Sequence, residues 1–241
     1  GNYTIFIFDA DGNEIMRKTY DEVKNNDNKI SIVAGTYTLV ARSSSDEVPV
    51  AAFEQPVYGV TKEFDIVAGM ETSIGELVCT LVQCKVTVSY SDEFLAAVTG
   101  NGSTTVELKA GSPLEYKLNA NGTYDKSAGY FAVDGNTMTV TFKGSVAGAT
   151  QKMTKVFSNI APKQWRQVKF IQKVNEQGNA TFDIVIQDLI SDATLNGVVN
   201  ADEDILAEDP DAPKGDGGIA LSIDYEAGCD AELTDLTNMV I

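Results

Sequence analysis

Histidine is absent from all 241 residues of the chain. It is the usual general base of Ser-His-Asp and Cys-His mechanisms and a common ligand of zinc and iron. The sequence also lacks a glycine-rich phosphate loop of the kind that joins a strand to a helix. A Ser-Lys dyad or a carboxylate pair stays open, but carboxylates are abundant in any acidic chain. We therefore expect a protein that is not an enzyme, with no catalytic residue, cofactor or metal site.

Cysteine is scarce, with only Cys79, Cys84 and Cys229. An odd count cannot form a complete disulfide framework. Cys79 and Cys84 are five positions apart, so on one strand they would face opposite sides. We interpret all three as small core hydrophobes. The alternative is a disulfide from Cys79 or Cys84 to Cys229.

Long apolar segments are also missing, so nothing in the sequence resembles a signal peptide or a membrane-spanning helix. The chain begins Gly1-Asn2 without methionine. We interpret this start as that of a processed export product, whose signal and membrane anchor would lie outside these residues.

Basic residues are few, 18 against 35 acidic ones, which gives a formal net charge of −17 and a pI of about 4.3. Such a charge repels nucleic acids and anionic membranes, and it favours solubility or basic partners. With 43% hydrophobic and 22% charged residues, the composition is that of a globular protein. The length suits two domains of about 100–120 residues each.

Hydrophobic residues alternate with polar ones in many short segments, the pattern of half-buried antiparallel strands. The expected strands include residues 85–90, 137–143, 182–186 and 218–225. Their expected inward side chains are Val86, Val88, Tyr90, Met138, Val140, Phe142, Phe182, Ile184, Ile186, Ile219, Leu221, Ile223 and Tyr225. Asn-Gly and Asp-Gly pairs between such segments predict tight turns. The predicted fold class is therefore all-β, with two tandem antiparallel β-sandwiches.

Three segments depart from this pattern. Residues 3–8 are apolar on both faces apart from Thr4, which suits a central strand covered on both sides or one masked by a partner. Residues 91–98 predict a short helix capped by Ser91, and residues 192–198 another helical turn. Residues 233–241 are weakly apolar and suit a final strand or a donor strand.

The predicted domains are residues 1–83 and 84–241. Residues 78–90 form a long strand-like segment that bridges them. Residues 200–216 are acidic and contain Pro210 and Pro213, so we expect a surface loop of the second domain, with strand-like sequence resuming at Ile219.

Two acidic segments are weighed as calcium sites. Residues 9–14 alternate Asp and Asn around Gly12, but lack the distal Glu of a full calcium loop, so we interpret them as a hairpin turn. Residues 200–216 supply enough oxygens without a fixed ligand spacing, and we interpret them as a solvated loop. Its carboxylates are Asp202, Glu203, Asp204, Glu208, Asp209, Asp211 and Asp216.

Aromatic residues are the other candidates, because sugar sites use exposed aromatic platforms. The single tryptophan, Trp165, lies where a strand should start, and we interpret it as packed against the sandwich. Tyr58, Tyr124 and Tyr130 lie near predicted turns and are the alternatives.

The succession of segments 30–41, 52–59, 64–69 and 81–88 resembles fimbrillin-like lipoproteins of Bacteroidetes. It is most similar to a domain-of-unknown-function family of cell-adhesion lipoproteins. The resemblance implies two transthyretin-like β-sandwiches on a lipid-anchored outer-membrane protein at the cell surface, and it transfers no binding or catalytic residue. Fimbrillins polymerise by strand exchange, a form of β-augmentation.

We therefore predict a non-catalytic adhesion protein or fimbrial (pilus) subunit or tip, with other fimbrial subunits as partners. The alternative is a surface lipoprotein that does not polymerise and binds a glycan or host matrix. A scaffold module of an outer-membrane complex is the third hypothesis.

Overall fold

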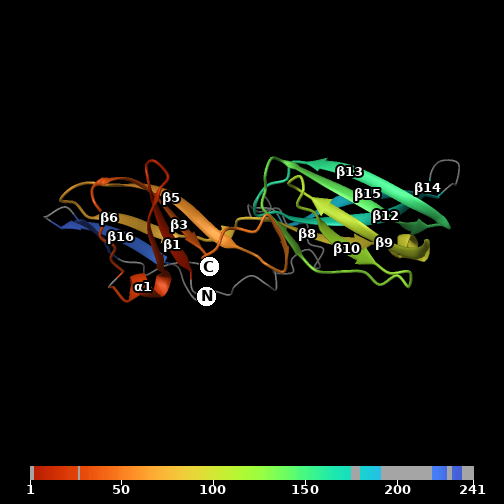
Figure 1. Cartoon of the computed structure of the whole chain (residues 1–241), viewed down its shortest axis with the longest axis horizontal. Helices are drawn as coiled ribbons and strands as arrows, with labels where there is room; N and C mark the ends of the chain where they lie inside the picture. The colour runs from red at the N-terminus through yellow and green to blue at the C-terminus, as the bar shows by residue number, and fades with distance from the viewer. Residues whose placement is uncertain (1–2, 27, 175–179, 191–218, 227–229, 235–241) are drawn as a thin grey trace. The chain divides into compact units, whose positions relative to one another are not determined.

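The computed structural model describes residues 3–26, 28–174, 180–190, 219–226 and 230–234, and it consists mostly of β-strands. Figure 1 shows the strands and the two short helices of these residues. The predicted all-β class is confirmed. The chain forms two compact units, which we describe separately.

The first unit contains a five-stranded antiparallel sheet and a three-stranded one. The order of the larger sheet is β2 (Glu14–Thr19), β1 (Thr4–Asp9), β3 (Gly35–Arg42), β5 (Tyr58–Ile66) and β7 (Thr80–Leu81). The smaller sheet is β17 (Asp230–Thr234), β16 (Ile219–Glu226) and β6 (Thr72–Leu77). Inward side chains of β1, β3 and β5 share one core with Ile74 and Leu77 of β6. Burial of these apolar side chains holds the two sheets together.

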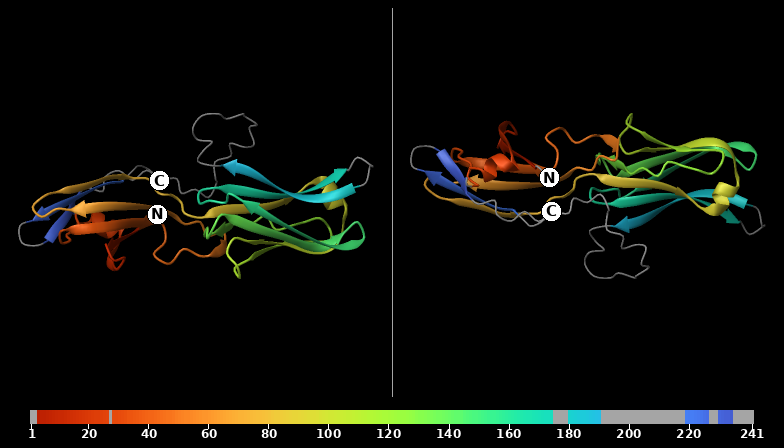
Figure 2. Two further views of the ribbon diagram at one scale, coloured as in Figure 1. Left: turned by 90° about the horizontal axis from the view of Figure 1, so that it is seen from above. Right: turned by 90° about the horizontal axis from the view of Figure 1, so that it is seen from below.

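The second unit also contains two sheets, which Figure 2 shows as separate layers. One is β10 (Leu114–Leu118), β9 (Val98–Glu107), β12 (Thr137–Val146) and β13 (Ala149–Ser158). The other is β15 (Ala180–Ile190), β14 (Trp165–Val174), β8 (Cys84–Tyr90), β11 (Gly129–Phe131) and β4 (Ala51–Phe53). All strand pairs are antiparallel except β14 with β8, a parallel pair that the sequence did not predict.

The core of the second unit is rich in aromatic side chains. Val86, Val88 and Tyr90 face inward from β8, as predicted, and so do the inward residues predicted for 137–143 and 182–186. Phe94 lies fully buried on α2 (Asp92–Ala96), which begins after the predicted cap Ser91. The Phe94 ring is 5.5 Å from those of Tyr90, Phe142 and Phe170, measured between centroids. Each such buried ring stabilises the fold by about 1.5–3 kcal/mol.

The second helix, α1 (Tyr20–Lys24), was not predicted. Its N-cap is Thr19, and Thr19 and Glu22 form a capping box through their side chains and backbone N–H groups. The spacing Thr-x-x-Glu is the sequence signal of such a box. Residues 192–198, the other expected helical turn, lie outside the described residues.

The division into units differs from the single predicted boundary near residue 83. The chain passes from the first unit to the second between Val48 and Pro49, returns at Val57, and passes again between Val82 and Gln83. Strand β4 therefore belongs to the second unit, where it pairs with β11. Strand β16, expected in the second domain, pairs with β6 of the first unit. A period-two pattern predicts a strand but not its neighbour, because pairing depends on contacts distant in sequence.

Residues 3–8 form most of β1, which pairs with β2 on one side and with β3 on the other. Ile5 and Ile7 face the core, whereas Phe6 points to the opposite face and is nevertheless only 1% exposed. The guanidinium groups of Arg17 and Arg42 lie 4.9 and 4.5 Å from its ring centroid. The apolar residue on the outer face is thus covered by cation–π contacts from neighbouring strands. The central-strand interpretation of residues 3–8 is confirmed.

Candidate functional site

The first acidic segment forms the turn between β1 and β2. The Asp9 carboxylate accepts hydrogen bonds from the backbone N–H groups of Asp11 and Asn13 at 3.0 and 2.8 Å, and from Asn13 Nδ2 at 3.0 Å. The side-chain bond from Asn13, followed by its backbone N–H, lowers the pKa of the Asp9 carboxyl. Both carboxylate oxygens serve the turn, and Gly12 supplies its positive φ of 82°. The hairpin interpretation is confirmed, while residues 200–216 lie outside the described residues.

The two cysteines of the described chain are buried, Cys79 in the first core and Cys84 in the second. Burial raises the pKa of the Cys79 thiol to about 11 and that of Cys84 to about 12. Both thiols are therefore protonated at neutral pH and act as core side chains. Cys229 lies outside the described residues.

The side chains of the aromatic candidates pack against other residues instead of projecting into solvent. Trp165 opens β14 as expected, its indole Nε1 donates to Thr87 Oγ1 at 3.2 Å, and Lys85 Nζ lies 4.2 Å from its ring. Tyr130 is fully buried. Tyr124 meets Tyr90 edge-on at 5.0 Å, and Tyr58 packs against the first core. None of these four rings is an exposed platform.

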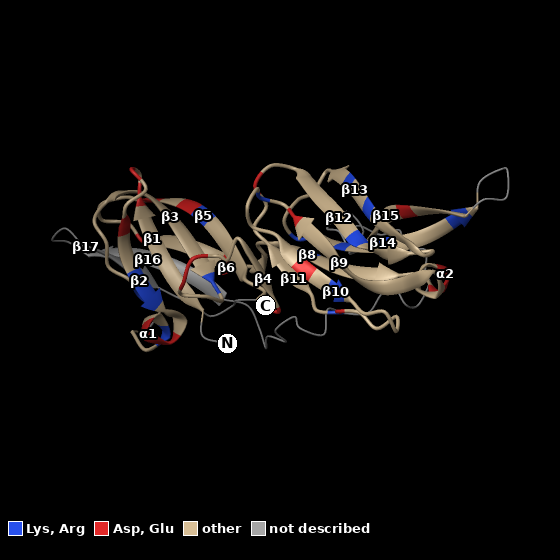
Figure 3. Ribbon diagram, turned by 45° about the vertical axis from the view of Figure 1, so that its right-hand side comes forward, with Lys and Arg blue, Asp and Glu red and all other residues tan. Residues whose placement is uncertain are grey.

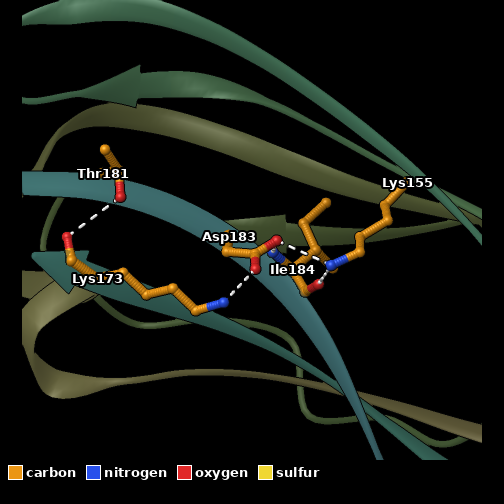
Figure 4. Close-up of polar contacts among 5 residues, drawn as sticks. All are labelled: Lys155, Lys173, Thr181, Asp183 and Ile184. Carbon is orange, nitrogen blue, oxygen red and sulfur yellow. Dashed lines mark hydrogen bonds and ion pairs between the residues drawn. The ribbon is translucent and has the colours of Figure 1, made fainter. Parts of the chain in front are cut away.

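A charged cluster joins the two sheets of the second unit (Figure 4). Asp183 on β15 accepts hydrogen bonds from Lys155 Nζ of β13 at 2.9 Å and from Lys173 Nζ of β14 at 2.6 Å. Lys155 Nζ also donates to the Ile184 carbonyl at 2.6 Å. Hydrogen bonds from Lys173 and then Lys155 lower the pKa of the Asp183 carboxyl to about 2. The two ion pairs of this ionised carboxylate link the two sheets. Such a carboxylate is a poor proton donor at neutral pH.

The main cationic feature of the second unit is a row of three lysines across the sheet β10-β9-β12-β13. Lys117 on β10 and Lys143 on β12 both lie opposite Ser103 of β9, and Lys143 lies directly opposite Lys152 of β13. All three lysines are exposed, whereas their neighbours Tyr116, Leu118 and Phe142 are buried. We call Lys117, Lys143 and Lys152 the lysine row. Because the alternate residues of these strands are buried, the lysine row lies on the outer face of the sheet. In Figure 3 the lysine and arginine positions along the strands are blue.

The polar surroundings of the lysine row suit hydrogen bonding. A shallow hollow of about 320 Å³ lies between Lys117 and Lys143, over Ser103. Asn101, Asn119 and Glu115 also line it. The next row of the sheet pairs Glu115 with Thr105, Thr105 with Thr141, and Thr141 with Thr154. The outer face thus presents ammonium, hydroxyl and amide groups together with the Glu115 carboxylate.

The lysine row was not predicted. Its members lie up to 35 positions apart (152 − 117 = 35). Taken singly, each lysine is simply a polar residue of an alternating strand. Only the pairing register brings them into line. The described residues contain no group of three or more acidic or cysteine side chains placed to hold a metal ion. Their helices are all too short and too polar to span a bilayer.

These features define a protein of two all-β units built from packed sheets. The chain belongs to the family described as "Domain of unknown function (DUF4493)", whose model matches residues 1–201. The sequence matches no curated protein. Among solved structures, it is similar to a protein from Bacteroides fragilis described as a "putative cell adhesion protein". That match has 7% sequence identity and a TM-score of 0.35, and it covers 78% of this chain and 83% of the other.

Proposed function

We propose that this protein is a non-catalytic adhesion module exposed at the cell surface, which binds its ligand through the outer face of the sheet β10-β9-β12-β13. The observation that carries the proposal is the lysine row, an exposed cationic array on a chain of net charge −17. Two other ionisable groups of the described chain have structural roles. Asp9 orders a turn and Asp183 joins two sheets.

The sequence resemblance to cell-adhesion lipoproteins of Bacteroidetes, together with the family assignment, supports the surface location. In this proposal a lipid anchor holds the protein on the outer membrane.

Surface exposure and adhesion are tested together on the organism that carries the protein. Antibodies raised against the purified chain should label intact cells, and cells lacking the chain should adhere less to mucin-coated and matrix-coated plates. A complemented strain should regain adhesion. If antibodies label only lysed cells, or if adhesion is unchanged in the deletion strain, the proposal is wrong.

A fimbrial subunit is the second candidate, and it is favoured by a sheet edge that has no partner along most of its length among the described strands. Strand β5 pairs with β3 along eight residues, but on its other side only Tyr58 and Gly59 pair, with β7. Among the described strands none pairs with Val60–Ile66 on that side. An extended segment of another copy would find main-chain hydrogen-bonding groups there. Strand β1 is a poor exchange site by comparison, since it has a partner on each side.

The fimbrial candidate predicts assemblies that resist detergent. Protein extracted from cells should run as a ladder on gels without boiling and as a monomer after boiling. Replacing Thr61 and Glu63 by proline, which removes two N–H groups of β5, should shorten the ladder. A chain that runs as a monomer under all conditions would exclude polymerisation and leave the adhesion module standing.

A further inference from the structure

The lysine row places three positive charges close together on one face of a chain that is acidic overall. Neighbouring strands of a sheet lie about 4.8 Å apart. Lys143 and Lys152 are therefore direct cross-strand neighbours, and Lys117 follows two strands away, across Ser103. None of the ion pairs between described residues involves these lysines. Two carboxylates, Glu107 and Glu115, lie on the same face, so the three lysines leave a small positive excess there.

The pairing of Lys143 with Lys152 also has an energetic consequence for the sheet. Like charges directly opposite each other on adjacent strands destabilise a sheet. The neighbouring cross-strand pair is the neutral Thr141 and Thr154, whose hydroxyl oxygens lie 3.1 Å apart. The sheet therefore carries a repulsive pair where an opposite charge or a hydroxyl would stabilise it. An anion bound between the two ammonium groups removes that repulsion.

The side chains around the lysine row indicate which class of partner fits this face. A protein partner would need several large aromatic or apolar anchors, whereas this face presents mostly lysine, serine, threonine and asparagine side chains. Glu107 and Glu115 also lie there, and Val156 is the large apolar side chain exposed on it among the described residues. Nucleic acid is disfavoured, because no aromatic ring of this row is available for stacking and three lysines are few for a dense row of phosphates. A polymer with many hydroxyls and spaced charges fits both the hydrogen-bonding groups and the lysines.

From these observations we infer that the outer face of β10-β9-β12-β13 binds an acidic polysaccharide, whose carboxylate or sulfate groups pair with Lys117, Lys143 and Lys152. The sugar hydroxyls hydrogen-bond to Ser103, Asn101 and Asn119 in the hollow between the lysines. This inference rests on the proposed adhesion function and names the chemical class of its ligand.

The test measures binding of the purified full chain to immobilised dextran sulfate, polygalacturonate and neutral dextran. The variant Lys117→Gln/Lys143→Gln/Lys152→Gln removes the row. The control Lys18→Gln/Lys24→Gln/Lys109→Gln removes the same charge from other surfaces. Circular dichroism and thermal melting establish that both variants fold, and relief of the like-charge pair should leave the first variant at least as stable as the parent chain.

The parent chain should bind one or both acidic polymers and not dextran, with an affinity that falls as salt rises. The row variant should bind about tenfold more weakly, and the control should bind like the parent. Equal losses in both triple variants, or no binding to either acidic polymer, would overturn the inference. If cells lacking the chain adhere less while the purified chain binds neither acidic polymer, the adhesion function stands and only the ligand class is wrong.

Discussion

Several single residues of this protein hold strands together or allow them to pack closely. Asp183 is the best example, because one carboxylate binds lysines from two different strands. Gly129 allows close packing, because its missing side chain leaves room for neighbouring core residues. Composition alone gave no sign of either role, since both depend on which strands meet.

Replacing Asp183 by asparagine should destabilise the second unit by about 1 kcal/mol at pH 7, because the two ion pairs are partly exposed to solvent. The folded-state pKa of about 2 lies below the ordinary aspartate value of 3.8, so the folded state favours the ionised carboxylate. Its contribution is fully present above about pH 4 and is lost as pH falls through 2. Thermal melting of both proteins from neutral to acidic pH should show curves that converge toward pH 2. The exposed Asp134, 3.6 Å from Lys109, offers the control Asp134→Asn, which should melt like the parent.

Gly129→Ala should destabilise the second unit by about 2–3 kcal/mol through overpacking. A Cβ there would lie 2.3 Å from Tyr116 Oη and 2.9 Å from Leu114 Cδ1. Chemical unfolding measures the loss. The double variant Gly129→Ala/Tyr116→Phe should lose less than the sum of the single losses, because the hydroxyl is the closest obstacle. Strict additivity would show that the clash is not the cause.

At the scale of elements, strands were well predicted where one face is apolar and the other polar. β8 and β12 follow this rule, and the buried residues of both were expected. The parallel pairing of β14 with β8 was not expected, because an alternating segment looks the same in either direction. The lysine row belongs to the same scale, since it exists only through the register of four strands.

Lys152→Glu should stabilise the second unit by about 0.5 kcal/mol, since it turns a repulsive cross-strand pair with Lys143 into an attractive one. Thermal melting at low salt should show the gain, and added salt should reduce it. Lys152→Gln, which only removes the repulsion, should give a smaller gain. A glutamate variant no more stable than the glutamine variant would mean that these two side chains do not interact.

For the whole molecule, the important feature is that the first unit is completed from the far end of the sequence. Strand β6 pairs with β16, which follows the second unit in the chain. The two cores share no residue, so each unit should have its own stability.

Removing residues 219–241 should therefore destabilise the first unit and leave the second nearly unchanged. Hydrogen exchange separates the two effects, with faster exchange expected for amides of β1, β3 and β5 and unchanged protection for those of β8 and β14. Equal loss of protection in both units would show that they unfold together. Preserved protection in both would mean that β6 does not depend on β16.

The amino-acid order is enough to predict the all-β class, most strands and their inward faces, because alternation of side chains is a local property of an extended chain. It also excluded histidine chemistry, because a missing residue type needs no structure to interpret. The folded structure was needed to show which strands pair, which unit contains β16, and which charges lie on one face. Those are contacts between residues distant in sequence, and they follow from register and burial together, which no local pattern encodes.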